Sequence, residues 1–496
     1  MLTGGWREAS SVGMLPIGRG SARPKLKTPS TIKDSRVPIR ESIYGYWSSP
    51  RAFVWVCAGA TIGIGNMARL PWLAGQYGGG AFLIAYLLAL CLIALPMLIA
   101  EWLVGRWTRP DLLSGFERLA QDAGGMRRGW KPLAVLALLS ALLTLAYYSV
   151  VAGWSVGYIF RAAGGELLAV DAGHSRDVFL GLVRDPERSL AWHTIFLLAA
   201  CIIVSQGVRE GLERGGRYLL GAAFLLLLCL MAYAARHGDV GAALHYLFAV
   251  DFSRLGWRGA MEAVQQAVFS VSLGLGVMLA YGGYLHGETR LMRAAVSVIA
   301  LDTFFALGAG IAINALLFGA GLSPVSGLAL LFQAVPMALP GIPMSIIVAT
   351  GFYMLVVAIT LASAIALMEP LVAWLMIRYR VPRTSAATAV AMVAWFLGIG
   401  AMLSFGVLDD ARLAGRNPFE WMQWLTARLL IPVGVLLSCI AVGRVLPLHV
   451  IEAGWGSERL TMFRVWRQLL RFPARIGLAA LLLYTLGLLD RLEQLW

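Results

Sequence analysis

Apolar stretches of about 20 residues recur along this chain, and they constrain its fold more than any other feature. Each stretch is long enough to cross the ~30 Å hydrocarbon core of a bilayer as a helix. The stretches are continuous and do not alternate polar with apolar residues, which excludes the strands of a membrane barrel. Only 14% of the 496 residues are charged, whereas soluble proteins carry about 25%. The sequence therefore predicts one all-α, polytopic membrane domain.

We expect about 11 transmembrane helices. Their predicted ranges are 51–74, 80–105, 130–163, 190–206, 215–235, 259–286, 292–319, 341–377, 384–407, 418–443 and 475–490. With the N-terminus placed inside, 29 of the 41 Lys and Arg residues fall in inner segments. Because cytoplasmic loops are enriched in these residues, the N-terminus is predicted to be cytoplasmic. An odd number of spans then places the C-terminus outside.

The basic segment 1–50 is expected to be a cytoplasmic tail, since it lacks the apolar core and cleavage site of a signal peptide. The net charge of +14 requires no nucleic-acid partner, because positive loops are usual at the inner surface of a membrane. The five cysteines all lie in apolar stretches without metal-ligand spacing. We therefore expect neither disulfides nor a cysteine metal site.

Two predicted spans are interrupted at membrane depth. The first contains "ATIGIGNMARLPW" (60–72), and the sixth contains "QQAVFSVSLGLGVMLAYGGY" (265–284). Backbone that leaves a helix in the membrane is tolerated only where it is buried in protein or lines a cavity. Two such breaks five spans apart predict a 5+5 inverted-repeat transporter with discontinuous helices 1 and 6. The expected repeats are 51–235 and 236–445, followed by a cytoplasmic segment and span 11 at 446–496.

The chemistry of the two breaks suits an amino acid carried together with a cation. Unwound carbonyls and hydroxyls are hard oxygen ligands for a small cation. The N-termini of half-helices present N–H groups and a positive dipole end to a carboxylate. For span 6 alone, the alternative is that its glycines only allow close helix packing.

Several motifs, in order along the chain, resemble those of the neurotransmitter:sodium symporter family. They are "GATIGIGNMARLPW" (59–72), "GGGAF" (78–82), "EWLVGR" (101–106), "YYSVVAGW" (147–154), "GVREGLER" (207–214), "FSVSLGLG" (269–276), "LDT" (301–303), "SAIALMEP" (363–370) and "RLLIPVG" (428–434). The set is most similar to the bacterial amino-acid branch. The resemblance implies sodium-coupled symport by alternating access in the bacterial inner membrane, by a monomer or a homodimer.

The resemblance also implies a substrate site at the two breaks. Its residues are Gly63, Ile64, Gly65, Thr144, Tyr148, Phe269, Ser270, Ser272, Leu275, Ser363 and Leu367. Span 1 backbone and the Tyr148 hydroxyl would bind the carboxylate, and span 6 would bind the amine. The side-chain pocket is mostly apolar, which implies a hydrophobic amino acid.

One or two Na⁺ sites are implied in the same way. The first comprises Thr61, Asn66, Ser270 and Asp302, and the second comprises Gly59, Ile62, Ile359 and Ser363. Asp302 can supply the negative charge that an anion supplies in chloride-dependent members, so we expect chloride independence. The alternative for Asp302 is a protonated acid that is hydrogen-bonded in the bundle. At the second site Ala362 replaces the threonine of the family, and Thr360 is a candidate substitute on the same helix face.

The gate positions depart from the family pattern. Where the family pairs Arg69 with an aspartate in span 10, this chain has Gln423, with Glu420 nearly one helical turn earlier. We expect Arg69 to hydrogen-bond Gln423 when the outer gate closes, with Glu420 as a more distant partner. At the inner gate, Tyr44 and Ile377 replace the Arg–Asp pair of the family.

Two other functions have some support in the sequence. "GWSVG" (153–157) matches a hydrolase motif by letter, but it lies in the middle of a predicted helix instead of at a strand–turn–helix elbow. We therefore do not expect an enzyme. The altered gates and the loss of the span 8 threonine leave a non-transporting or weakly coupled amino-acid sensor as the alternative function.

Overall fold

The computed structural model describes residues 45–109, 112–122, 131–167, 172–286, 289–339, 341, 343–445, 451–452, 455 and 460–489. Residues 1–44, which include Tyr44 and nearly all of the predicted tail, lie outside this set. Across the described residues the secondary structure is helical, and the β-structure is limited to two isolated bridges. These bridges join Gly79 to Val250 and Leu413 to Arg416. The all-α prediction is confirmed.

Within the described part of the chain, eight helical segments are long and apolar enough to cross a membrane. They are Gly80–Thr108 (α4 Gly80–Ala89, the π-helical turn η1 Leu90–Ala94 and α5 Leu95–Thr108), Lys131–Ala163 (α7), Pro186–Ser205 (α9), Val208–His237 (η2 Val208–Glu213 and α10 Arg214–His237), Leu291–Gly319 (α14), Ser345–Tyr379 (α17), Arg383–Leu403 (α18) and Pro418–Arg444 (α19 Pro418–Trp424, η4 Leu425–Leu430, α20 Ile431–Ile440 and the start of η5 Ala441–Val445). A ninth candidate is a bent pair, α1 (Pro50–Thr61) followed by Ile64–Gln76, at an angle of 61°. This second half consists of α2 (Ile64–Ala68) and α3 (Leu70–Gln76). Together these nine segments match the predicted spans 1–5 and 7–10.

Predicted spans 6 and 11 are built differently. Span 6 consists of α12 (Gly256–Ser270) and α13 (Val277–Gly283), separated by a non-helical stretch at 271–276. Span 11 ends with α23 (Arg475–Thr485), which continues from α22 (Leu460–Leu469) through η6 (Leu470–Ala474). The helix therefore begins well before residue 475, within the segment that was expected to be a cytoplasmic connection.

Shorter helices join the spans. They are α6 (Leu112–Asp122), α8 (Ala172–Val183), α11 (Val240–Phe248), and α15 (Gly327–Ala329), η3 (Leu330–Ala334) and α16 (Val335–Ala338), which follow one another. We use "outer end" for the end of the bundle that holds the end of α3 and the start of α19. The "inner end" holds the start of α1, and both names follow the orientation that the charge distribution predicts.

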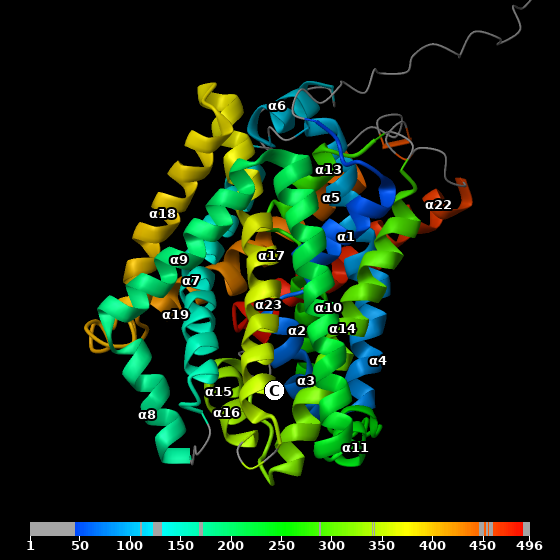
Figure 1. Ribbon diagram of the computed structural model, residues 1–496. Helices are drawn as coiled ribbons and strands as arrows, with labels where there is room; N and C mark the ends of the chain where they lie inside the picture. The colour runs from blue at the N-terminus through cyan, green and yellow to red at the C-terminus, as the bar shows by residue number, and fades with distance from the viewer. Residues whose placement is uncertain are drawn as a thin grey trace, which may run out of the picture. The chain divides into compact units, whose positions relative to one another are not determined.

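The predicted break in span 1 is present. The helix α1 ends at Thr61, Ile62 and Gly63 have extended backbone, and α2 starts at Ile64. The Asn66 side chain caps the new helix, because its Oδ1 accepts a hydrogen bond of 3.1 Å from the Gly63 N–H. Figure 1 shows α1 and α2 among α10, α14 and α17, and helix contacts confirm that α1 packs on all three.

The break in span 6 requires glycine. Gly274 and Gly276 have φ angles of 74° and 72°, in the left-handed region that side chains rarely adopt. A Cβ atom on Gly274 would also lie 2.7 Å from the Val435 side chain. The Gly274 N–H instead donates a 2.8 Å hydrogen bond to the buried carboxylate of Glu101 on α5. Both predicted discontinuous helices are therefore confirmed.

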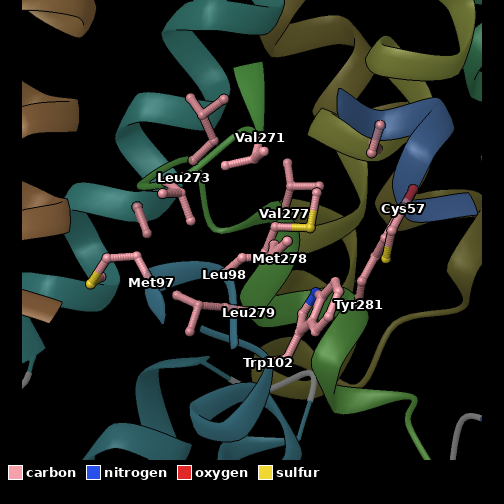
Figure 2. Close-up of a cluster of buried hydrophobic side chains, with 14 of the residues drawn as sticks. Cys57, Met97, Leu98, Trp102, Val271, Leu273, Val277, Met278, Leu279 and Tyr281 are labelled. Carbon is pink, nitrogen blue, oxygen red and sulfur yellow. The ribbon is translucent and has the colours of Figure 1, made fainter. Parts of the chain in front are cut away.

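The core packs tightly around this break. Figure 2 shows Cys57 of α1, Met97 and Trp102 of α5, and residues within and after the stretch 271–276 in one buried cluster. The α5 and α13 backbones approach closely, since a Cβ on Gly105 would lie 2.0 Å from the Leu279 carbonyl oxygen. A Cβ on Gly282 would lie 2.6 Å from the Trp102 carbonyl oxygen. The irregular segment is therefore fixed by a close-packed surrounding and is not a loose loop.

Candidate functional site at the two helix breaks

The two breaks touch each other in the middle of the bundle. The Ser272 hydroxyl, in the break of span 6, donates a 2.9 Å hydrogen bond to the Ala60 carbonyl at the end of α1. Beside this contact lies a cavity of about 820 Å³. A volume of this size is typical of small-molecule sites.

Every residue predicted for substrate binding lines this cavity. These are Gly63, Ile64, Gly65, Thr144, Tyr148, Phe269, Ser270, Ser272, Leu275, Ser363 and Leu367. They come from the break in span 1, α7, the end of α12 with its following break, and α17. The structure thus brings together positions from four spans. Phe269, Leu275 and Leu367 make part of the wall apolar, while the breaks and hydroxyls make another part polar.

Two hydroxyls in the cavity wall lack a protein partner among the described residues. The oxygens of Tyr148 and Thr144 are buried and make no hydrogen bond within normal geometry. Gly63 lets the backbone of the span 1 break lie close to the Tyr148 hydroxyl. A Cβ atom on Gly63 would lie 3.2 Å from the Tyr148 hydroxyl and 3.5 Å from the Ser363 hydroxyl. A buried polar group without a partner costs about 1–3 kcal/mol. The arrangement therefore fits a polar ligand group at the break of span 1.

The residues predicted for the first Na⁺ site form one buried cluster. Asn66 Nδ2 donates to Asp302 Oδ1 at 2.8 Å and lies 3.4 Å from the Ser270 hydroxyl. Ser270 in turn donates a short hydrogen bond to Asp302, and Tyr86 donates to Ser270 at 3.0 Å. Thr61 is the last residue of α1, so its carbonyl has no intrahelical donor.

This cluster fits a cation. Asp302 is fully buried, and no ion pair to its carboxylate is found in the described part of the chain. Its hydrogen-bond partners Asn66 and Ser270 are neutral, while a buried carboxylate is stabilised most by an opposite charge. The Asp302 carboxylate, the Ser270 hydroxyl and the Thr61 carbonyl offer oxygen ligands to such a cation. In this conformation Asn66 turns its amide nitrogen to Asp302 and its oxygen to the Gly63 N–H. No group of three or more His, Cys, Asp or Glu occurs within the described residues, so the cluster does not resemble a transition-metal site.

The residues predicted for the second Na⁺ site also lie together. The Ser363 hydroxyl lies 3.1 Å from the carbonyl oxygens of both Ile62 and Ile359. Gly59 faces the same helix, since a Cβ on it would lie 3.7 Å from Ala362 Cβ. In this conformation the Thr360 hydroxyl donates to the Val356 carbonyl of its own helix at 2.8 Å, so its substitution for the missing threonine stays a prediction. This site therefore offers one hydroxyl and backbone carbonyls.

Arg69 has a different partner from the predicted one. Its Nη2 lies 2.7 Å from Glu262 Oε2 on α12 and 3.1 Å from Gln265 Oε1, and its Nη1 lies 3.2 Å from Gln266 Oε1. Glu262 is held from the other side by the Tyr484 hydroxyl of α23, at 2.7 Å. In this conformation Arg69 therefore bridges span 1 to span 6 and not to span 10.

Gln423 and Glu420 nevertheless line the same cavity as Arg69. Glu420 is engaged in capping its own helix, because its carboxylate accepts from the Asn417 N–H at 3.1 Å. The cavity extends past these residues to Arg416 and Trp424 at the outer end. An Arg69–Gln423 contact stays a prediction for a conformation in which this end is closed.

The inner end is sealed by packed aromatics and an ion pair. Trp47 is buried. Its Nε1 donates to the Tyr281 carbonyl at 3.0 Å, and its backbone N–H donates to the Tyr284 carbonyl at 3.2 Å. The Tyr284 hydroxyl donates to the Glu369 carboxylate at 2.5 Å. Arg383 binds both carboxylate oxygens of Glu369, one of them at 3.1 Å. This bidentate pair joins α17 to α18 at the inner end, and Ile377, farther along α17, cannot form such an ion pair.

Sequence reasoning missed Glu262 and the Glu369–Arg383 pair. A signal for Glu262 was available, since it shares a helical face with Gln265, Gln266 and Phe269 at spacings of three, four and seven residues. All four residues line the cavity. For Glu369 the signal was an acid within an apolar span, which demands a charged partner.

Comparisons with known proteins agree with this architecture. A family model described as the sodium:neurotransmitter symporter family matches residues 44–175 and 185–453. The chain is 27% identical over 451 residues to the uncharacterized sodium-dependent transporter YhdH of Bacillus subtilis, covering 90% of this chain and 98% of that protein. It is 25% identical over 454 residues to the sodium- and chloride-dependent GABA transporter 2 of Mus musculus, covering 80% and 73%. Among solved structures, the crystal structure of MhsT in complex with L-phenylalanine has a TM-score of 0.80 and 32% identity, over 89% of this chain and 99% of that one.

Proposed function

Because this chain belongs to the sodium:neurotransmitter symporter family, we propose that it imports a hydrophobic amino acid together with Na⁺ by alternating access. The observation that carries this proposal is the contact between the two breaks. There, Asp302 with Asn66 and Ser270 forms a buried polar cluster beside the cavity of about 820 Å³. Ser270 belongs to both the cluster and the cavity wall, so a cation and a substrate would share a ligand. Such sharing couples the affinity for one to the presence of the other.

An amino acid fits the cavity by its polarity. The break of span 1, with the unpartnered Tyr148 hydroxyl, would bind the carboxylate, and the carbonyls and hydroxyls around Phe269 and Ser270 would bind the ammonium group. The apolar side chains of Phe269, Leu275 and Leu367 favour a hydrophobic substrate side chain. L-Phenylalanine in the MhsT structure supports the same class.

The proposed coupling ions are one or two Na⁺. The first would bind Thr61, Asn66, Ser270 and Asp302, and the second Gly59, Ile62, Ile359 and Ser363. Asp302 brings its own negative charge to the first site, so transport would not require chloride. This would distinguish the chain from relatives described as sodium- and chloride-dependent.

Alternating access is supported by the asymmetry of the two ends. The cavity reaches Arg416 and Trp424 at the outer end, while Trp47, Tyr284 and the Glu369–Arg383 pair close the inner end. We place the N-terminus in the cytoplasm of a bacterial cell and the cavity mouth outside it, from the distribution of Lys and Arg. In an inside-negative membrane, each entering Na⁺ contributes about 2.3 kcal/mol per 100 mV to uptake.

The deciding experiment is uptake into proteoliposomes. Radiolabelled leucine, isoleucine, valine, methionine and phenylalanine are offered under an inward Na⁺ gradient and an inside-negative potential. At least one should accumulate with Na⁺ and not with K⁺, and replacing chloride by gluconate should change nothing. Protein carrying Asp302→Ala is the control and should not accumulate substrate. Na⁺-dependent binding without accumulation would instead establish the sensor function.

A further inference from the structure

A second cavity, of about 400 Å³, opens at the inner end between the first turns of α1 and α14. Three arginines line it, Arg51, Arg290 and Arg293, and all three are exposed. The described residues of its lining include no Asp or Glu. It shares no lining residue with the substrate cavity.

The backbone adds to the positive charge of this cavity. The helices α1 and α14 both start here, and the first N–H groups of a helix form the positive end of its dipole. Arg290, the residue before α14, makes no side-chain capping bond to it. On the adjacent α10 side, Glu210 pairs with Arg214 and Glu213 pairs with Arg217. Each of these two acids thus has an arginine partner four residues later in the chain.

The surroundings of the cavity match the boundary of a bilayer. Trp55 lines the cavity, is 37% exposed and packs edge-on against Phe224 with ring centroids 6.1 Å apart. Tryptophan favours the level of the lipid headgroups. Farther along α14, Val296 and Phe304 are 52% and 56% exposed, which leaves an apolar strip for acyl chains.

We propose that this cavity binds the headgroup phosphate of an anionic phospholipid of the inner leaflet. Guanidinium groups bind phosphate oxygens with two parallel hydrogen bonds, and Arg51, Arg290 and Arg293 surround one space. The hydroxyls of Thr289 and Ser297 in the lining suit the glycerol part of the headgroup. Basic cavities between membrane helices on the cytoplasmic side are suited to such lipids. A free phosphate would use the arginines, whereas only a lipid would also use the apolar strip.

The test compares lipids and inorganic phosphate on the full chain in a neutral detergent. Thermal unfolding is followed with added dioleoyl phosphatidylglycerol, dioleoyl phosphatidylcholine or sodium phosphate, and native mass spectrometry counts retained lipid. We expect phosphatidylglycerol alone to raise the unfolding midpoint and to be retained as one molecule. Arg51→Gln, Arg290→Gln and Arg293→Gln combined should abolish both effects.

The matched control removes the same number of charges from exposed arginines at the outer end, with Arg176→Gln, Arg184→Gln and Arg236→Gln. This variant should respond to phosphatidylglycerol like the parent. If the triple Gln variant does not fold, a second variant with Arg51→Lys, Arg290→Lys and Arg293→Lys keeps the charge. Native mass spectrometry of this second variant should still show one retained lipid. Equal effects of the two lipids, or full stabilisation by inorganic phosphate, would overturn the proposal. Loss of the response in the control would do so as well.

Discussion

Neutralising Glu262 should shift the outer gate toward its closed form. Here Glu262 lies 2.7 Å from Arg69 through one carboxylate oxygen and accepts a 2.7 Å hydrogen bond from Tyr484 through the other. Glu262→Gln keeps the size of the side chain but removes its charge. Arg69 is then left with amide partners on α12, which are chemically equivalent to Gln423 on α19. The ion pair that holds Arg69 away from span 10 is lost.

The size of the shift follows from the exposure of the pair. The Arg69 and Glu262 side chains are 33% and 17% exposed, so the pair is neither fully solvated nor fully buried. Exposed ion pairs contribute about 0–1 kcal/mol, and hydrogen bonds to charged groups about 1.5–3 kcal/mol. We expect about 1–2 kcal/mol, which is about a 5–30-fold change in the open-to-closed ratio.

Cysteine labelling in the cavity can measure this change. Ala427 lines the cavity, and Ala427→Cys in a background without the five native cysteines provides the reporter. The rate is measured with a charged thiol reagent in Na⁺ plus half-saturating substrate. It should be lower in Glu262→Gln than in the parent, by up to the change of about 5–30-fold in the open-to-closed ratio. Tyr484→Phe should lower the rate less, because Glu262 keeps its charge.

Glu420→Gln is the matched control, since it removes another carboxylate from the wall of the same cavity. Its carboxylate caps its own helix and does not contact Arg69 in this conformation, so the labelling rate should not fall below the parent value. The reasoning is refuted if Glu262→Gln labels at the parent rate, or if Glu420→Gln lowers the rate equally.

Three other substitutions test the site and the fold. Asp302→Asn should abolish Na⁺-dependent substrate binding while the protein still folds, and unchanged Na⁺ titrations of binding would remove Asp302 from the cation site. Tyr148→Phe should lower substrate affinity about 10–100-fold, because a hydroxyl donor to a charged group contributes about 1.5–3 kcal/mol; an unchanged Kd would make Tyr148 a packing residue. Gly274→Ala should destabilise the protein by about 1–3 kcal/mol, through its φ of 74° and the clash with Val435. Thermal unfolding tests this against Gly221→Ala on α10, where a Cβ meets nothing within 4 Å and no loss of stability is expected.

Features that are local, or that belong to a family motif, could be predicted from the sequence. Glycines and polar residues within apolar spans revealed the breaks at 62–63 and 271–276, since few other sequences leave a helix in a membrane. The motifs then indicated which spans meet there, and all eleven substrate positions line one cavity.

Partner choice could not be predicted in the same way. Arg69 lines one cavity with residues of both α12 and α19, and a sequence does not show which of two facing helices is nearer in a given conformation. The Glu369–Arg383 pair joins the interior of α17 to the first residue of α18. The sequence shows Arg383 only as one of the positive charges between two spans, because the turn that directs it back toward Glu369 depends on tertiary packing.

The close contact between α5 and α13 has a mechanical consequence for transport. With Gly105 against Leu279 and Gly282 against Trp102, the two helices meet backbone to backbone and can slide only by breaking many contacts at once. They should therefore move as one rigid unit, and the non-helical backbone at 271–276 is the place where α13 can turn relative to α12. Spin labels on α5 and α13 should keep a constant separation through the transport cycle, while the separation between α12 and α13 changes. The close contacts at Gly105 and Gly282 would therefore make span 2 move together with the second half of span 6.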